Sequence, residues 1–247
     1  MTYAQRNAIQ NPATGLMVFC TNCDSSGQPQ FYNGNRWCNM LGQQAALPVV
    51  TNLPSVTIGT QIWSSKNLDV SKYRNGDPIP QVTDATQWGS LNTGAWCWYN
   101  NDSAIYAANY GKLYNWYAVN DPRGLAPLGW HVPTDAEWNI MEKFLDPSVD
   151  TTCRCGTGNA IGPILKNTTG WNGGGNGNNS SGFSANPGGG RFSGGSFLNS
   201  GSNGYWWNAS AYDNTLVWLR LIYYYGTVIQ RNYTNKVNGF SVRVVRD

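Results

Sequence analysis

A glycine-rich segment with large apolar residues spaced along it constrains the fold of this chain more than any other feature. The run GWNGGGNGNNSSGFSANPGGGRFSGGSFLNSGSNG spans residues 170–204. Its composition is compatible with a flexible linker. However, Phe183, Phe192, Phe197 and Leu198 recur within it, and a pure linker has no use for such side chains. We therefore expect an ordered, irregular loop that these four residues anchor.

The rest of the chain is similarly rich in turns and flat side chains, with 29 Gly, 12 Trp and 14 Tyr in 247 residues. This length fits one large domain, or one domain and a small module. Charged residues make up only 12% and aromatic residues 13%. Charge-driven disorder is thus excluded, and the aromatic residues supply bulk for a core.

The charge pattern argues against two classes of partner. The net charge is +3, and the basic residues are scattered, the densest being Arg243 and Arg246. A nucleic-acid-binding face concentrates its basic residues, so no nucleic acid is expected. No apolar run approaches the roughly 18–20 residues of a membrane span. The opening MTYAQRNAIQ has no apolar segment, so we expect no signal peptide in this chain.

Six cysteines leave their pairing open: Cys20, Cys23, Cys38, Cys97, Cys153 and Cys155. The first three have a spacing compatible with zinc, but structural zinc sites normally need four ligands. The only histidine, His131, is distant in sequence. A disulfide from Cys20 to Cys23 or Cys38, or free thiols, is therefore the preferred interpretation, and no metal or cofactor is expected.

Residues 1–55 are predicted to form a small β module and a linker. Short apolar-aromatic runs, GLMVFCT, QFYNG and NRWCNM, are separated by turn residues that include Asn33-Gly34, a strong hairpin signal. The prolines of LGQQAALPVVTNLPS, near 41–55, indicate the linker. A second hairpin is expected around Gly59-Thr60, and an irregular stretch from Ser71 to Ala108.

Two helices are predicted in the middle of the chain. Tyr110, Leu113, Tyr114 and Tyr117 recur at helical spacing over 110–119. The second helix, 135–145, has an explicit capping box, with Thr134 as N-cap and Glu137 three residues later. The segment 205–247 is predicted to form strands and loops, because TLVWLRLIYYY is rich in β-branched and aromatic residues and FSVRVV alternates.

Six phrases in order resemble the Fibrobacter succinogenes major paralogous domain family, a branch of the C-type-lectin-like fold. They are IGTQIWSSKNLDV (58–70), YGKLYNWYAV (110–119), GWHVPTDAEW (129–138), GFSANPGGGR (182–191), GYWWNAS (204–210) and GFSVRVVRD (239–247). The resemblance implies an α+β domain over 56–247, with two helices, small antiparallel sheets and much irregular loop. Residues 1–45 lie outside it and resemble short β repeats of bacterial surface and phage tail-fibre-like proteins.

The last forty residues or so resemble the variable regions of proteins diversified by retroelements, in which adenines of asparagine codons are randomised. The resemblance implies a variable region at about 205–238. Randomised AAC codons encode Leu, Ile, Tyr, Thr and Val but never Trp, Gln or Lys, so Trp218, Gln230 and Lys236 are implied to be fixed, with Trp207, Arg220, Arg231, Gly239 and Phe240 as scaffold. The family's usual late cysteine is replaced here by Val244, so packing of Val242 and Val244 must hold the last strand.

Catalytic interpretations are weaker than structural ones. A triad would need His131, which directly precedes the capped helix. Asp135 and Glu137 lie in a first helical turn, where carboxylates favour the helix dipole. The related formylglycine-generating enzymes act through late cysteines, and residues 156–247 contain none. In the calcium-binding lectin pattern Trp-Asn-Asp, Ala209 replaces the acid here. We therefore expect no enzymatic activity.

The chain is predicted to be a display protein, on a cell surface or phage tail, that binds a protein or cell-surface ligand. Trp206, Trp207 and Trp218 are expected in the core, whereas Tyr223, Tyr224 and Tyr225 cannot all face one core, because neighbouring strand residues alternate. The predicted ligand-binding residues, expected to form one exposed patch, are Asn208, Asp213, Leu216, Leu219, Tyr223, Tyr225, Thr227, Ile229, Tyr233, Thr234 and Val237. The alternatives are a structural phage-fibre or envelope component and, less favoured, an enzyme related to the formylglycine generators.

Overall fold

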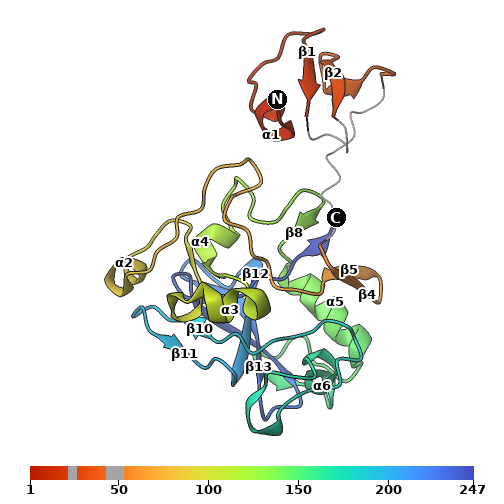
Figure 1. The fold of residues 1–247 in the computed structure, drawn as a ribbon. Coiled ribbons are helices and arrows are strands. Elements are labelled where there is room, and N and C mark those ends of the chain that lie inside the picture. Colours follow the sequence, from red (N-terminus) through yellow and green to blue (C-terminus); the bar gives the residue numbers. More distant parts are fainter. Residues whose placement is uncertain (22–26, 43–52) are drawn as a thin grey trace.

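The computed structural model describes residues 1–21, 27–42 and 53–247. Its mixed helices and small antiparallel sheets confirm the predicted α+β class (Figure 1). Residues 1–42 contain α1 (Tyr3–Asn7) and an antiparallel sheet of β1 (Met17–Cys20), β2 (Gln28–Tyr32) and β3 (Trp37–Asn39). The predicted turn at Asn33-Gly34 joins β2 and β3, with Gly34 at φ 98°. The predicted linker falls mostly outside the described residues.

Residues 53–247 contain three further sheets. The first has the strand order β4 (Ser55–Ile58), β5 (Gln61–Ser64), β16 (Val245–Arg246) and β8 (Trp130–His131). The second runs β11 (Phe197–Leu198), β10 (Gly190–Arg191), β15 (Gly239–Phe240), β7 (Leu113–Asn115) and β6 (Trp96–Cys97). The third, called here the C-terminal sheet, consists of β12 (Asn203–Ala211), β13 (Leu216–Tyr223), β14 (Ile229–Asn235) and β9 (Gly156–Thr157).

The helices of this part are short except for two. They are α2 (Ala85–Gly89), α3 (Ser103–Tyr110), α4 (Trp116–Val119), α5 (Asp135–Leu145) and α6 (Ile161–Leu165), with single turns η1 (Tyr99–Asn101) and η2 (Asn172–Gly174). The predicted helix 135–145 is confirmed as α5, and both hydrogen bonds of the Thr134–Glu137 capping box are present. Trp138 and Met141 on its inner face are fully buried.

The predicted helix over 110–119 is wrong. Helix α3 ends at Tyr110, because Gly111 takes a φ of 68° that a helix cannot continue. Strand β7 follows, and all three of its residues are buried between β6 and β15. The side chain of Asn115 then caps the single turn α4. The aromatic residues at helical spacing therefore belong to three different elements: the end of α3, the buried strand β7 and the short helix α4.

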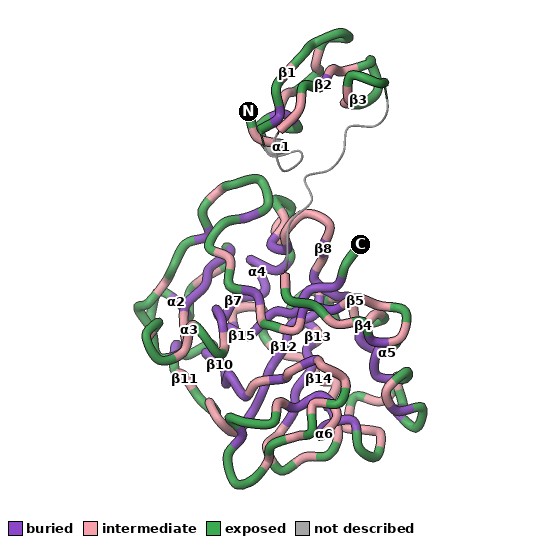
Figure 2. The backbone as a smooth tube through the Cα atoms, turned by 45° about the vertical axis from the view of Figure 1, so that its right-hand side comes forward, coloured by how far each residue is buried: buried purple, intermediate pink, exposed green. Residues whose placement is uncertain are grey.

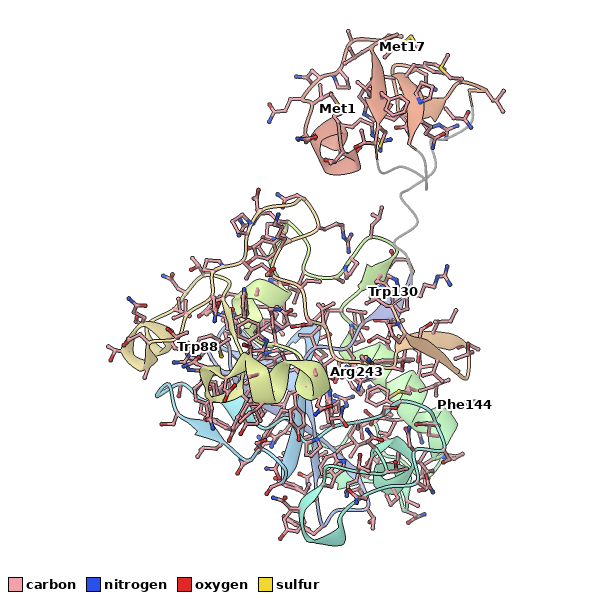
Figure 3. All side chains as sticks on the ribbon, viewed as in Figure 1. Met1, Met17, Trp88, Trp130, Phe144 and Arg243 are labelled. Carbon is pink, nitrogen blue, oxygen red and sulfur yellow. A yellow bond between two sulfur atoms is a disulfide. The ribbon has the colours of Figure 1, made fainter. Side chains whose placement is uncertain are left out.

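The glycine-rich segment is an ordered loop, as expected, but its anchors are only partly those predicted. Phe183 is fully buried, and Phe192 and Phe197 pack against two different core clusters, whereas Leu198 is exposed. Two buried arginines hold the loop instead. Arg191 donates to the carbonyls of Val82, Thr83 and Gly195. Arg243, near the centre of Figure 3, donates to the carbonyls of Ser64, Phe183 and Ser184.

Buried residues concentrate along β12, β13 and the final strands (Figure 2). Phe240 stacks on Tyr205 with ring centroids 4.7 Å apart and also contacts Trp207. Val242 and Val244 are fully buried, which confirms that apolar packing holds the last strand. The described part of 215–245 contains no helix, as predicted.

Candidate functional site

Most of the predicted ligand-binding residues lie on strands β12, β13 and β14 of the C-terminal sheet. The others, Asp213, Tyr225, Thr227 and Val237, lie in its turns or in the loop after β14. Strand β13 pairs with β12 and β14 on its two sides, with Trp206 opposite Arg220 and Trp218 opposite Tyr233. The short strand β9 adds a fourth strand by pairing with Ile229 and Gln230. Neighbouring residues of each strand alternate between the two faces, so the register decides which predicted residues are accessible.

Both faces of β13 are covered at its centre. Val217, Leu219 and Leu221 enter one core cluster, while Ile222 enters another on the opposite face. The prediction that Leu219 and Ile229 are exposed is therefore wrong, because their side chains are only 4% and 2% exposed. A strand that packs between two layers is apolar on both faces. Leu and Ile can be encoded by a randomised AAC codon, but this does not show whether such a residue is buried or at the surface.

Asn208 is also buried, contrary to its predicted place on the binding surface. Its side-chain oxygen accepts a bond from the Ser210 backbone, and its own carbonyl accepts a bond from Trp116 Nε1. It lies where the pairing of β12 with β13 shifts register, between Trp207 and Ala211. Asn208 thus fixes an irregular strand and is not accessible to a ligand.

The remaining predicted residues do not form one patch. Asp213, Leu216, Tyr233 and Thr234 lie at the end of the sheet where β12 turns into β13. Tyr223, Tyr225 and Thr227 lie at the opposite end, in and beside the turn from β13 to β14. The two ends are about 23 Å apart, since β13 separates them and a strand rises about 3.3 Å per residue. Val237 packs partly buried against a third core cluster.

We call the first end the aromatic end, made of Tyr212, Trp218 and Tyr233. Tyr212 stacks on Tyr233 with ring centroids 4.3 Å apart, and Trp218 meets Tyr212 edge to face at 4.9 Å. The expectation that Trp218 is a core residue is wrong, since it is half-buried at this rim. Tyr212 is not among the predicted binding residues, although it lies in the same strand–turn segment as Asp213 and Leu216.

Arg154 extends the aromatic end from outside residues 205–238. Its guanidinium lies 4.2 Å from the centre of the Tyr233 ring and donates to the tyrosine hydroxyl. A disulfide joins Cys153 and Cys155 on either side of it, and the Cys155 carbonyl accepts a bond from the Arg231 backbone. The Cys-x-Cys spacing was the one signal in the sequence for this loop, and only the strand pairing places it beside Tyr233.

A buried ion network fixes the aromatic end to α5. Arg220 donates to Asp135 and Glu142, and Arg231 donates to Asp135 while lying 3.6 Å from the centre of the Trp218 ring. Burial alone would raise the pKa of Asp135, but bonds from Arg231 and the charge of Arg220 outweigh it and lower the pKa. Burial raises the pKa of Glu142 despite Arg220. The aromatic rings therefore rest on a rigid polar base.

The turn at this end is stabilised internally. Asp213 accepts bonds from the backbone of Thr215 and Leu216 and from the Thr215 hydroxyl. The bond from the Thr215 backbone is the largest cause of the lowered pKa of Asp213. Its carboxylate is thus occupied in shaping the turn, while Leu216 remains half-buried and Asn214 and Thr215 are exposed.

We call the opposite end the tyrosine turn, made of Tyr223, Tyr224, Tyr225 and Thr227. The prediction that at least one of the three tyrosines is exposed is confirmed, because Tyr225 is 70% exposed. It stacks in parallel on Tyr223, with centroids 5.3 Å apart. Lys166 donates to the carbonyls of Tyr224 and Gly226, and burial lowers its pKa to about 8. Lys166, which directly follows α6, thus supports this turn.

Groups considered for catalysis or metal binding have structural partners. His131 Nδ1 lies 2.7 Å from Asp247 Oδ1, and its Nε2 lies 2.6 Å from Glu137 Oε1. Cys20 is disulfide-bonded, whereas Cys38 is a buried free thiol. Among the described residues, no three His, Cys, Asp or Glu side chains gather closely enough to hold a metal ion. No helix in the described ranges is long and apolar enough to span a membrane.

Comparison with known proteins gives two matches along the chain. The family described as the Fibrobacter succinogenes major domain matches residues 56–246. A second family, described as a phage tail like trimerisation region, matches residues 1–53. No curated protein matches the chain. No solved structure matches it either.

Proposed function

The chain belongs to the Fibrobacter succinogenes major domain family, and on that premise we propose that it is a non-enzymatic display protein whose C-terminal sheet binds a protein or cell-surface ligand. The observation that carries this proposal is the aromatic end. Three aromatic rings and Arg154 lie at the surface on a buried ion network. Tyrosine, tryptophan and arginine are the residues that dominate binding energy at protein interfaces.

Tyrosine also favours recognition for an entropic reason. It presents a large contact area while losing few rotatable bonds, as in antibody paratopes. The stacks of Tyr212 on Tyr233 and of Tyr223 on Tyr225 restrict these rings before any ligand arrives. The predicted site residues that are exposed or partly exposed are Asp213, Leu216, Tyr223, Tyr225, Thr227, Tyr233, Thr234 and Val237. We add Tyr212, Trp218 and Arg154 to them and leave out the buried Asn208, Leu219 and Ile229.

The N-terminal match supports a place on a phage tail or comparable surface fibre. Residues 1–53 match a region described as phage tail like and trimerising. We propose that three copies of this chain associate through this region and so present three C-terminal sheets. Multivalent display of this kind raises avidity without any new contact. A C-type-lectin-like fold for residues 56–247 remains part of the proposal.

Diversification by a retroelement is tested on the coding DNA. A nearby near-copy of the segment that encodes residues 205–238, differing only at adenines and close to a reverse-transcriptase gene, is the expected finding. Absence of such a copy would favour the second candidate function, a structural fibre or envelope component. That candidate rests on the N-terminal match, since a fibre protein that contacts one constant neighbour needs no diversified face.

Binding by the sheet is tested with two displayed libraries selected against a purified protein target, hen lysozyme. In the first library, the codons for residues 214–216, 225, 227, 233 and 234 are randomised. In the second, the codons for Leu219, Leu221, Ile222 and Ile229 are randomised. Folded binders should come from the first library only. If the first library yields no folded clones, the proposed face is a structural part of the domain.

A further inference from the structure

The small sheet of residues 1–42 has one face on which the large apolar side chains of Met17 and Phe19 are exposed. The strand register places Met17 opposite Phe31, Phe31 opposite Cys38, and Phe19 opposite Pro29. Directly paired residues point to the same side of a sheet, and alternate residues of a strand do so too. One side of the sheet is therefore formed by Met17, Phe19, Pro29, Phe31 and Cys38, all of them apolar. We call it the apolar face.

The opposite side of this sheet, which carries Val18, Gln30 and Trp37, is covered by α1. Gln30 is buried there, and its side chain accepts a hydrogen bond from the buried Arg6 near the end of α1. The Arg6 guanidinium also lies 5.6 Å from the centre of the Trp37 ring. Helix α1 thus covers the Gln30 side, whereas Met17 and Phe19 on the apolar face are 58% and 53% exposed. Figure 3 labels Met17 on this strand.

Residues 1–42 bury few apolar side chains and expose many, whereas a module that folds alone needs a buried apolar core. Within the described residues of 1–42, the only fully buried apolar side chains are Cys20 and Cys38. The same stretch holds six of the twelve exposed large hydrophobic side chains of the described chain, namely Met1, Leu16, Met17, Phe19, Met40 and Leu41. Sequences of about 40 residues normally fold only with disulfides, metals or oligomerisation, and three strands need a packed apolar face.

We infer that the apolar face is the surface through which three copies of this chain associate, an inference that rests on the proposed self-association of residues 1–53. Identical copies suit this face because it carries no charge. The whole of 1–53 contains only Arg6, Asp24 and Arg36 as charged residues. Around a three-fold axis, each face packs between the two others, and the cyclic interface closes without leaving an apolar edge.

In this arrangement, the apolar core that residues 1–42 lack in a single chain is completed by the two other chains. Met17, Phe19 and Phe31 from three chains would form one shared core that no single chain supplies. Trimer formation and folding of this module are then one event, because the module gains its buried surface only in the assembly. The three C-terminal sheets are thereby held in one trimer, although the trimer contacts come only from the N-terminal residues.

The mass of the full chain in solution tests the assignment. Wild type should have three times the mass of the 27.1 kDa chain. The variant Met17→Ser/Phe19→Ser should sediment as a monomer. The matched control Ile105→Ser/Phe144→Ser also removes two exposed apolar side chains, but from α3 and α5, and should remain trimeric. The melting temperature of the larger domain, followed by tryptophan fluorescence, should be the same in all three proteins.

Two outcomes separate failure of this inference from failure of the proposed self-association. A trimeric wild type with a trimeric Met17→Ser/Phe19→Ser variant overturns the assignment of the face and leaves self-association intact. A monomeric wild type overturns both. Oxidation by peroxide gives a second measurement, on wild type alone. Met17 should react more slowly than a side chain that is mostly exposed in a single chain, and rapid oxidation would contradict its burial.

Discussion

Nη1 of Arg220 on β13 donates a hydrogen bond of 2.7 Å to Oδ1 of Asp135, the first residue of α5. The same carboxylate accepts bonds from Arg231 on β14. One acidic side chain at a helix start therefore ties the helix to two neighbouring strands. Because Arg231 also lies against the Trp218 ring, the buried network determines where the aromatic end of the C-terminal sheet is held.

Removing Arg220 should be strongly destabilising. Arg220→Met leaves the buried Glu142 without its cation, and loss of one partner of a buried pair costs about 3–5 kcal/mol. The free energy of unfolding in urea measures this loss. The double variant Arg220→Met/Glu142→Leu should recover part of it, because the unpaired acid is gone. A double variant that is less stable than Arg220→Met would contradict this account.

Two phenylalanines provide a matched test of core packing. Phe240 is fully buried and contacts three aromatic rings, so Phe240→Ala should cost about 3–5 kcal/mol. Phe144 on α5 is 62% exposed, and Phe144→Ala should change the stability by no more than about 0.5 kcal/mol. Denaturant midpoints compare the two. Equal effects would mean that the last strands are not packed as described.

Four single substitutions distinguish the buried residues of the C-terminal sheet from those at its surface. Leu219→Ala and Ile229→Ala should each cost about 2–5 kcal/mol, because both side chains lie in the core. Leu216→Ser and Tyr225→Ser, at the two ends of the sheet, should stay within about 0.5 kcal/mol. Thermal unfolding provides the measurement. A large loss for Tyr225→Ser would place the tyrosine turn in the folded core instead of the proposed binding surface.

The capping box of α5 gives a smaller and well-defined effect. Thr134 Oγ1 accepts the Glu137 backbone bond, so Thr134→Ala should cost about 1 kcal/mol. Thr134→Ser keeps the hydroxyl and should restore most of this stability. Urea denaturation resolves a difference of this size. If Ala and Ser are equivalent at this position, the cap contributes nothing and the helix start is held by the Asp135 network alone.

His131 should make stability depend on pH near neutrality. Burial alone lowers its pKa, but the bonds to Asp247 and Glu137 outweigh burial and raise it above 6.5. The folded state therefore binds the proton more tightly, so the stabilisation is complete below pH 6.5 and is lost as the pH rises through the folded pKa. The effect should not exceed about 1 kcal/mol, because the pair is partly exposed. His131→Gln should abolish this pH dependence, and an unchanged slope would assign it elsewhere.

Local signals in the sequence determined those parts of the fold that depend on a few neighbouring residues. The Thr134–Glu137 capping box, the turn at Asn33-Gly34 and the hairpin at Gly59-Thr60 were all predicted correctly, because their hydrogen bonds and dihedral angles involve residues within one turn. The failure at 110–119 has the same cause. Helical spacing is a local pattern, and β7 exists only because β6 and β15 pair with it from distant parts of the chain.

Only the tertiary structure decided which residues of the C-terminal sheet are buried and which are accessible. The sequence alone does not show that Leu219 on β13 is buried while Tyr225 in the following turn is exposed. The difference arises because another layer of the fold covers Leu219. Arg154 lies beside Tyr233 because β9 pairs with β14, a contact that spans 79 residues. Strand pairing of this kind is set by the packing of whole layers, in which each strand gains its burial from segments far away in sequence.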